Sequence, residues 1–399
     1  MFWQNYLSDE IIAGFDRYKY NAVDTNPISN YLSHPFWNWV VKHLIPRWLA
    51  PNLMTLLGYL FFLLNVAVMA YYDPHFYASS RDHPDNPPVP DWVWLFCAMC
   101  IFLSYTLDGC DGKQARRTGS STPLGELFDH GLDSSITHVT PVVLYSIFGQ
   151  GEFGISPIRV YFAIWCVMAC FIFSHWEKYN TGVLYLPWGY DIGQLSIILA
   201  MTITYFRTYL FWKFAITIPF LNKTLDSGDL AEISLYVGSG MSLPISLYNI
   251  YRSYRDQTGK MRSLWEANRP LVCTTILFVS YTVWIWNSKC AVLDNNPRIF
   301  LWTVGTSFSY FTVRLIISQM SNTRCEVFHW LLVPIISATC VVVVCDTAQY
   351  ELFILYGLSG LVTTAWLHMG MCVVWQMADH FQIHVFSLSK PQQNSRKES

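Results

Sequence analysis

Long apolar runs separated by short polar segments dominate the hydrophobic pattern of this 399-residue chain. A helix needs about 20 predominantly apolar residues to cross the hydrocarbon of a bilayer. The pattern therefore predicts ten membrane-spanning helices, over residues 52–72, 92–112, 125–148, 157–176, 189–206, 232–251, 270–288, 299–319, 327–346 and 351–375. The stretch 208–221 is too short and too interrupted for another span, and we interpret it as interfacial or re-entrant.

The segments outside these spans complete the predicted organisation. Residues 1–51 are rich in Trp and Tyr, which is typical of a cytosolic or interfacial segment lying along the membrane surface. We expect one transmembrane domain over residues 52–380 and a polar cytosolic tail over 381–399. Because residues 1–24 lack the apolar core of a signal peptide, we expect the first span to act as its own insertion signal.

Composition and charge support an all-α, polytopic membrane protein. Asp, Glu, Lys and Arg make up only 13% of the chain, against roughly 25% in soluble domains. The net charge of −2 leaves no basic stripe for a phosphate backbone, which argues against nucleic acid as a partner. With both termini in the cytosol, most Lys and Arg residues fall on cytosolic segments, as the positive-inside rule requires.

A polar segment at the cytosolic end of the second and third predicted spans departs from this pattern. It reads DGCDGKQARRTGSSTPLGELFDHGLD and contains four aspartates: Asp108, Asp111, Asp129 and Asp133. The first two are three positions apart and the last two are four apart, so each pair shares a helix face. Thr122 and Pro123 interrupt the chain between them. We therefore expect an antiparallel helix pair across which the four carboxylates converge.

Carboxylates beside membrane helices are costly unless they bind an ion or a polar substrate. Mg²⁺ takes carboxylate oxygens together with substrate phosphates, and two such ions suit a displacement at a diphosphate. His130 is suited to accept a proton near neutral pH, and the guanidinium of Arg116 is suited to a phosphate. These residue types favour a two-metal phosphotransfer site.

The other residues of the segment have structural interpretations. Gly109, Gly112 and Gly125 lack side chains where a helix or a nucleotide must come close. We interpret Arg117 as a positive-inside anchor and Glu126 as an interface residue.

The segment matches a long and specific family signature, D-x2-D-G-x2-A-R-x8-G-x3-D-x3-D. Its fixed positions are Asp108, Asp111, Gly112, Ala115, Arg116, Gly125, Asp129 and Asp133. The chain therefore resembles the CDP-alcohol phosphotransferase family. The segments FDRYKYNAVDTNPIS, WLAPNLMTLLGY, SHWEKYNTGVLYLPWGYD and QMSNTRC resemble its eukaryotic choline/ethanolamine phosphotransferase branch, over nearly the whole chain.

This resemblance implies the family's transmembrane fold, with residues 52–380 as the catalytic domain. It also implies transfer of phosphoethanolamine from CDP-ethanolamine to diacylglycerol on the cytosolic side of an endoplasmic reticulum or Golgi membrane. The four aspartates would hold two Mg²⁺ or Mn²⁺ ions, with Asp108 bridging. His130 would deprotonate the diacylglycerol hydroxyl, with Asp133 as the competing base. The residues expected to contact the CDP-alcohol are Asn52, Gly112, Ala115 and Arg116.

Several alternatives stay open at this level. The donor could be CDP-choline, or both CDP-alcohols. Membrane lipid is an expected partner, and the chain could form a homodimer. From the residues alone, Asn52 is an ordinary helix-start residue. A divalent-cation transporter would also place carboxylates in the membrane. Arg116 beside the carboxylates and the absence of an inverted repeat in the sequence favour the phosphotransferase.

Overall fold

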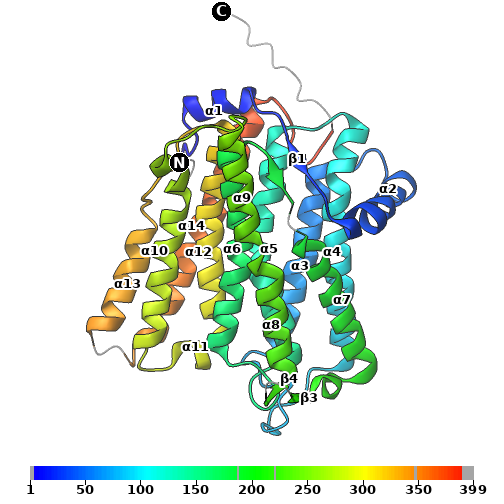
Figure 1. Ribbon diagram of the computed structural model, residues 1–399, viewed down its shortest axis with the longest axis vertical. Helices are drawn as coiled ribbons and strands as arrows, with labels where there is room; N and C mark the ends of the chain where they lie inside the picture. Colours follow the sequence, from blue (N-terminus) through cyan, green and yellow to red (C-terminus); the bar gives the residue numbers. More distant parts are fainter. Residues whose placement is uncertain (1–3, 187, 220–221, 346–347, 389–399) are drawn as a thin grey trace, which may run out of the picture.

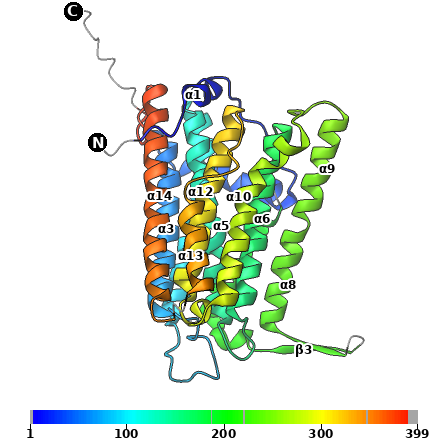
Figure 2. The ribbon, with the colours of Figure 1, turned by 90° about the vertical axis from the view of Figure 1, so that its left-hand side faces the viewer.

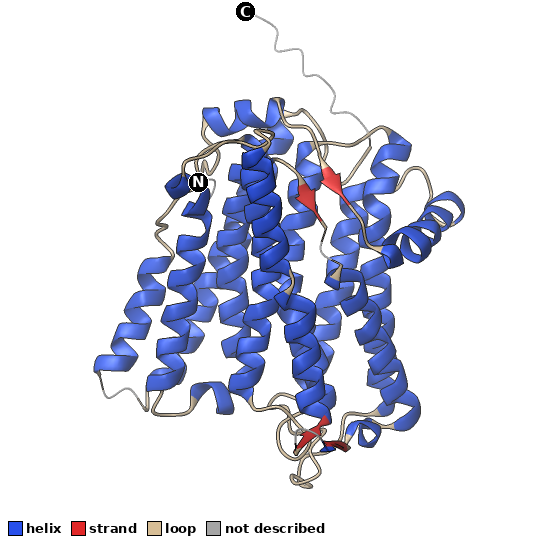
Figure 3. Ribbon diagram, in the orientation of Figure 1, coloured by secondary structure: helices blue, strands red, loops and turns tan. Residues whose placement is uncertain are grey.

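The computed structural model describes residues 4–186, 188–219, 222–345 and 348–388. Within these ranges the chain is a bundle of long helices standing side by side, with only two short two-stranded sheets outside it (Figures 1 and 3). This arrangement confirms the predicted all-α class.

The long helices of the bundle are joined by loops and short elements at its two ends. The bundle contains α3 (Pro51–Tyr72), α4 (Asp91–Thr118), α5 (Pro123–Phe148), α6 (Pro157–Thr181), α7 (Gly189–Arg207), α8 (Ser227–Gly240), α9 (Ser242–Arg255), α10 (Leu264–Asn287), α12 (Pro297–Ser321), α13 (Leu332–Val344) and α14 (Glu351–His380). The shorter elements are α1 (Asp9–Asp16), β1 (Ala22–Val23), η1 (Ser29–Ser33), α2 (His34–His43), β2 (Leu184–Tyr185), η2 (Tyr209–Trp212), β3 (Ala215–Ile218), β4 (Lys223–Asp226) and α11 (Val292–Asn295).

Each of the ten predicted spans coincides with helix, and seven helical segments are long and apolar enough to cross a membrane. One of the seven is α8 and α9 taken together, from Ser227 to Arg255. The predicted spans at α5, α7 and α13 fall outside this set, and α13 has only 13 residues. Residue 346, the end of the span predicted at α13, lies outside the described ranges. The multi-pass membrane architecture is confirmed, whereas the number of ten crossings stays a prediction.

The central helix of the bundle is α12, which packs against α5, α6, α10 and α14. In its most apolar window 83% of the residues are buried, against 11% for α8 and α9, which stand at the edge of the bundle (Figure 2). The segment 208–221 forms η2 and β3, and β3 pairs with β4 at the end of the bundle opposite α1 (Figure 1). The described part of this segment lies at that end of the bundle, and its position at a membrane interface stays a prediction.

The N-terminal segment covers the other end of the bundle. The helix α1 packs against α12, and Phe15 lies in the main core. The strand β1 pairs in parallel with β2, which follows α6. His380, at the end of α14, lies 2.7 Å from Asp16 of α1, so both terminal regions meet at this end. The division of the chain at residues 51 and 380 stays a prediction, and residues 389–399 of the expected tail lie outside the described ranges.

Candidate active site

The polar segment forms the end of α4, a short turn and the start of α5. Gly119 adopts a left-handed conformation (φ 67°) directly after α4, which glycine does at little cost. The Thr122 hydroxyl then accepts a hydrogen bond from the Gly125 backbone N–H and caps α5, with Pro123 in its first turn. The two helices consequently run in opposite directions from one end of the bundle, as the sequence predicts.

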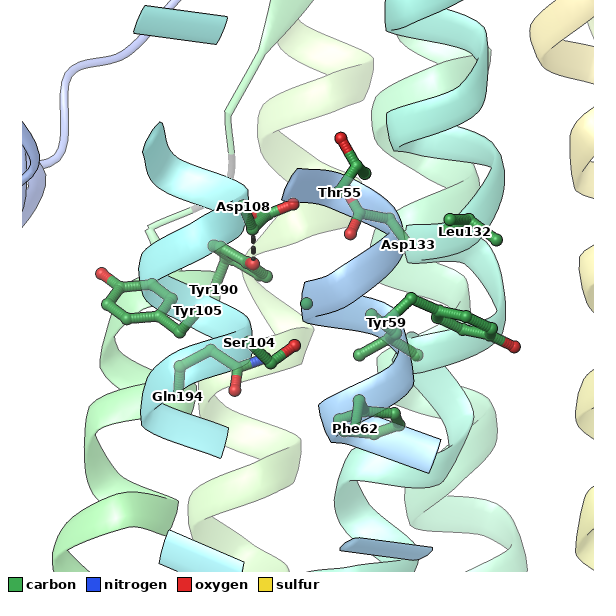
Figure 4. Close-up of a pocket in the computed structure, with 12 residues that line it drawn as sticks. Thr55, Tyr59, Phe62, Ser104, Tyr105, Asp108, Leu132, Asp133, Tyr190 and Gln194 are labelled. Atoms are coloured by element: carbon green, nitrogen blue, oxygen red, sulfur yellow. Dashed lines mark hydrogen bonds between the residues drawn. The ribbon is translucent and has the colours of Figure 1, made fainter. Parts of the chain in front are cut away.

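The contact between these helices differs from the expected direct pair. The helix α3 packs closely against both α4 and α5, and it lies between them in Figure 4. Gly58 allows this approach, because a Cβ atom there would lie 3.2 Å from the backbone oxygen of Ser104 on α4. The expectation of one shared α4–α5 interface is therefore wrong, and the carboxylates converge instead around the end of α3.

The four predicted aspartates and His130 fall into two overlapping groups. Ligand atoms of Asp108, Asp111 and Asp129 all lie within 4.8 Å of one another, and so do those of Asp129, His130 and Asp133. Asp129 is common to both groups, whereas the expected bridging residue was Asp108. The arrangement thus brings together all the predicted metal ligands and the predicted base.

Two hydroxyl groups from other helices hold the α4 carboxylates. Thr55 of α3 donates a hydrogen bond of 2.5 Å to Asp111, which is 7% exposed. Tyr190 of α7 donates a hydrogen bond of 2.9 Å to Asp108 (Figure 4). Sequence analysis did not single out either residue. Their only signal was membership of the segments WLAPNLMTLLGY and SHWEKYNTGVLYLPWGYD.

His130 lies between the two α5 carboxylates. Its Nδ1 atom is 3.7 Å from Asp133 Oδ2 and 3.9 Å from Asp129 Oδ2. Among the described residues, neither His130 Nε2 nor Asp129 Oδ1 has a hydrogen-bond partner, although both atoms are buried. Buried polar atoms are normally satisfied, so an unpaired carboxylate oxygen inside a cluster of acids fits a cation-binding site.

The three glycines of the segment meet different neighbours. A Cβ atom on Gly109 would overlap the indole ring of Trp37 on α2. At Gly112 the nearest group is the guanidinium of Arg116, with Nη1 at 3.5 Å. At Gly125 it is Asn52 Oδ1, at 3.3 Å. The expected close approach at Gly109 is therefore by the ring of Trp37, whereas at Gly112 it is by the end of the flexible Arg116 side chain.

A matched pair of substitutions tests these two environments. Gly109→Ala should destabilise the protein by about 1–3 kcal/mol, because the indole of Trp37 must shift in a packed region. Gly112→Ala should leave stability nearly unchanged, since its Cβ meets only the end of a flexible side chain. Thermal unfolding of both purified variants measures the difference. Equal melting temperatures would contradict the assignment of Gly109 to helix packing.

The two arginines of the segment have separate environments. Arg117 donates hydrogen bonds of 2.5 and 2.8 Å to the backbone oxygens of Val41 and Ile45, so it anchors α2 and the residues after it. Arg116 is exposed and makes no hydrogen bond or ion pair within the described ranges. Its guanidinium lies over Gly112, beside the carboxylates, where a phosphate-binding side chain is expected.

Asn52 lies at the start of α3, near the first turn of α5. Its Nδ2 atom donates a hydrogen bond of 3.0 Å to the backbone oxygen of Val385, after α14. Asn52 is only partly buried. Contact between Asn52 or Ala115 and a CDP-alcohol stays a prediction.

A buried ion pair beside the aspartates attaches the N-terminal segment. Lys178 of α6 lies 2.6 Å from Glu126 of α5, with side chains 2% and 10% exposed. The Tyr18 hydroxyl donates a hydrogen bond of 2.5 Å to Glu126, and Lys178 lies 2.8 Å from the same hydroxyl. Burial, and then the Glu126 charge, raise the pKa of Tyr18, so its proton stays in place. Glu126 therefore lies at the interface between α5, α6 and the N-terminal segment, as the sequence predicts. Its partners there, Lys178 and Tyr18, were not singled out from the sequence.

A pocket extends from the aspartates along the bundle, between α3, α4, α5 and α7 (Figure 4). Asp108 and Asp133 line it together with Tyr190, and Phe62 and Ile136 line it as apolar groups. The pocket therefore joins the carboxylate cluster to apolar surface within the helices.

Comparison with known proteins identifies the family. Residues 48–221 match the CDP-alcohol phosphatidyltransferase family. Ethanolaminephosphotransferase 1 of Homo sapiens is 48% identical over 386 residues, covering 97% of this chain and 95% of that protein. The chain belongs to this family. Ethanolaminephosphotransferase 1 of Mus musculus is 47% identical over 97% of the chain and 95% of that protein. Choline/ethanolaminephosphotransferase 1 of Saccharomyces cerevisiae is 25% identical over 96% and 98%.

Family membership confirms the resemblance seen in the sequence. The chain is an enzyme of the CDP-alcohol phosphotransferase type, in a family that generally uses divalent metal ions. Its matched region contains the whole carboxylate cluster, Arg116 and Asn52.

Proposed function

We propose that this enzyme transfers phosphoethanolamine from CDP-ethanolamine to diacylglycerol, giving phosphatidylethanolamine and CMP. The observation that carries the proposal is the convergence of four carboxylates and His130, two of which, Asp108 and Asp133, also line a pocket between the helices. The names of the relatives that are 47–48% identical support ethanolamine as the headgroup.

The carboxylate cluster fits divalent cations. It offers only oxygen ligands from aspartates, which Mg²⁺ and Mn²⁺ prefer, and one buried oxygen of Asp129 is without a partner among the described residues. Asp108, Asp111 and Asp129 would hold one ion, and Asp129 and Asp133 would hold the second. Two ions held by these aspartates would neutralise the charge of a diphosphate and would favour a displacement at phosphorus.

The protein's own groups supply binding and proton transfer. Arg116, whose guanidinium lies over Gly112, would bind the diphosphate, and Asn52 and Ala115 would contact the nucleotide. His130 would take the proton of the diacylglycerol hydroxyl. That oxygen forms a bond to the β-phosphorus while the bond to the bridging oxygen breaks, and CMP leaves. Asp133, 3.7 Å from His130, is the competing base.

The location of the pocket suits a lipid acceptor. It lies between helices of a multi-pass membrane protein and is lined in part by Phe62, Leu132 and Ile136, so we propose that diacylglycerol enters it from the bilayer. The cluster lies at the end of the bundle that also carries α1 and the end of α14 (Figure 1). We propose that this end faces the cytosol, where CDP-alcohols dissolve, at an endoplasmic reticulum or Golgi membrane. A homodimer stays a prediction.

Donor competition tests the headgroup. The purified full-length protein, given labelled CDP-ethanolamine and CDP-choline together with diacylglycerol and Mg²⁺ or Mn²⁺, should prefer CDP-ethanolamine by about tenfold or more in kcat/KM. Equal use would support a dual enzyme, as the yeast relative's name describes that protein. Exclusive use of CDP-choline would overturn the proposed donor. Metal flux across vesicles without CMP release would support the transporter alternative.

A further inference from the structure

A second buried histidine lies beside the ring of His130. It is His175 of α6, which is 2% exposed. The two imidazole rings are 5.5 Å apart at their centroids and meet edge to face at 68°. Phe171, one turn earlier on α6, also contacts the His175 ring, with a centroid distance of 4.7 Å. The position of the His175 ring is therefore set by packing on α5 and α6.

A glutamine from the central helix fixes His175 further. Gln319 of α12 is 6% exposed, and its Nε2 atom lies 2.9 Å from His175 Nδ1. Because α5, α6 and α12 all pack against one another, each contributes one side chain to a row that runs from His130 through His175 to Gln319. The buried hydrogen bond between Gln319 and His175 holds the His175 ring in one orientation.

His130 itself lacks such a hydrogen bond. Its contacts with Asp129 and Asp133, at 3.9 and 3.7 Å, exceed hydrogen-bond distance. Its Nε2 atom is buried and has no partner among the described residues. The orientation of this ring consequently depends on what packs against it, and His175 is the aromatic neighbour in contact with it.

We infer that His175, held by Gln319, is a positioning residue that fixes the His130 ring for proton transfer from the lipid alcohol. This inference rests on the proposed role of His130 as the base. A positioned base must lie within hydrogen-bond reach of the proton it removes, and small misplacements lower turnover without weakening substrate binding.

Three variants of the full-length enzyme test the inference. His175→Phe keeps an aromatic ring but removes the bond to Gln319, and Gln319→Leu removes it from the other side. Both should lower kcat by about 10- to 100-fold and leave the KM for CDP-ethanolamine within about twofold.

The matched control is His138→Phe on α5. His138 is 1% exposed and contacts Trp302 edge to face, but neither of its ring nitrogens has a partner in the described part of the chain. The kcat of the His138→Phe variant should stay within about twofold of that of the parent enzyme.

Other results would overturn the inference. One is an unchanged kcat in His175→Phe and Gln319→Leu, and another is a rise in the KM for CDP-ethanolamine with no change in kcat. A third is an equal loss of kcat in His138→Phe, together with less folded protein in size-exclusion chromatography for all three variants, which would make the effect one of folding. His130→Ala, assayed in parallel, separates the two proposals. Full activity in that variant would remove the base role itself, whereas an inactive His130→Ala beside a fully active His175→Phe would remove only the positioning role.

Discussion

Asp129→Asn is expected to abolish metal-dependent CMP release, lowering kcat by about 10³-fold or more. Asp129 belongs to both groups of ligand atoms in the carboxylate cluster, so its replacement weakens both proposed cation sites at once. Asparagine retains the size of the side chain and removes its charge. The enzyme should therefore keep its fold and lose its activity.

The measurement is CMP release from CDP-ethanolamine with diacylglycerol over a range of Mg²⁺ and Mn²⁺ concentrations. Asp9→Asn is the matched control, because Asp9 is exposed on α1 and belongs to neither group. Thermal unfolding and size-exclusion chromatography should be alike for both variants and the parent enzyme. Full activity of Asp129→Asn at low metal concentration would show that the metal-site assignment is wrong.

His130→Ala should lower kcat by about 10²- to 10⁴-fold, the usual contribution of a general base. Binding of CDP-ethanolamine should change little, because Arg116 and the carboxylate cluster are proposed to hold the donor. The physical reason is that His130 would act only on the acceptor's proton, so its loss affects the reaction step and not donor binding.

Separate measurements of donor binding and single-turnover rate test this prediction. His83→Ala serves as control, since His83 is a partly exposed histidine in the loop before α4, next to Asp82 and outside the carboxylate cluster. If His130→Ala loses only donor affinity and keeps its turnover, the base role moves to Asp133.

The membrane architecture could be predicted from the chain because each apolar run carries its own reason to be a helix. Backbone groups in hydrocarbon must be satisfied within the segment, so a run of sufficient length predicts a helix without knowledge of its neighbours. The number of crossings is harder to predict. The third predicted span, α5, contains Glu126, Asp129 and Asp133, and the span at 232–251 is divided into α8 and α9 near Met241.

The candidate site was predictable where its residues are close in sequence. The spacing of Asp108 with Asp111, and of Asp129 with Asp133, fixes which carboxylates share a helix face. The same reasoning failed for the contact between the helices. A helix pair joined by a short turn suggests direct packing, but α3 packs against both helices, and the absence of a side chain at Gly58 lets it come close to α4.

By itself, the sequence determined that the chain is a helical membrane enzyme of the CDP-alcohol phosphotransferase family and which aspartates form its polar cluster. These properties depend on local periodicity and on a compact signature. Only the tertiary structure decided that Asp129 is shared by both groups, that Thr55 and Tyr190 hold the α4 carboxylates, and that His175 and Gln319 lie behind His130. Those contacts join residues from different helices, and their geometry depends on how the helices pack, which no spacing along one helix specifies.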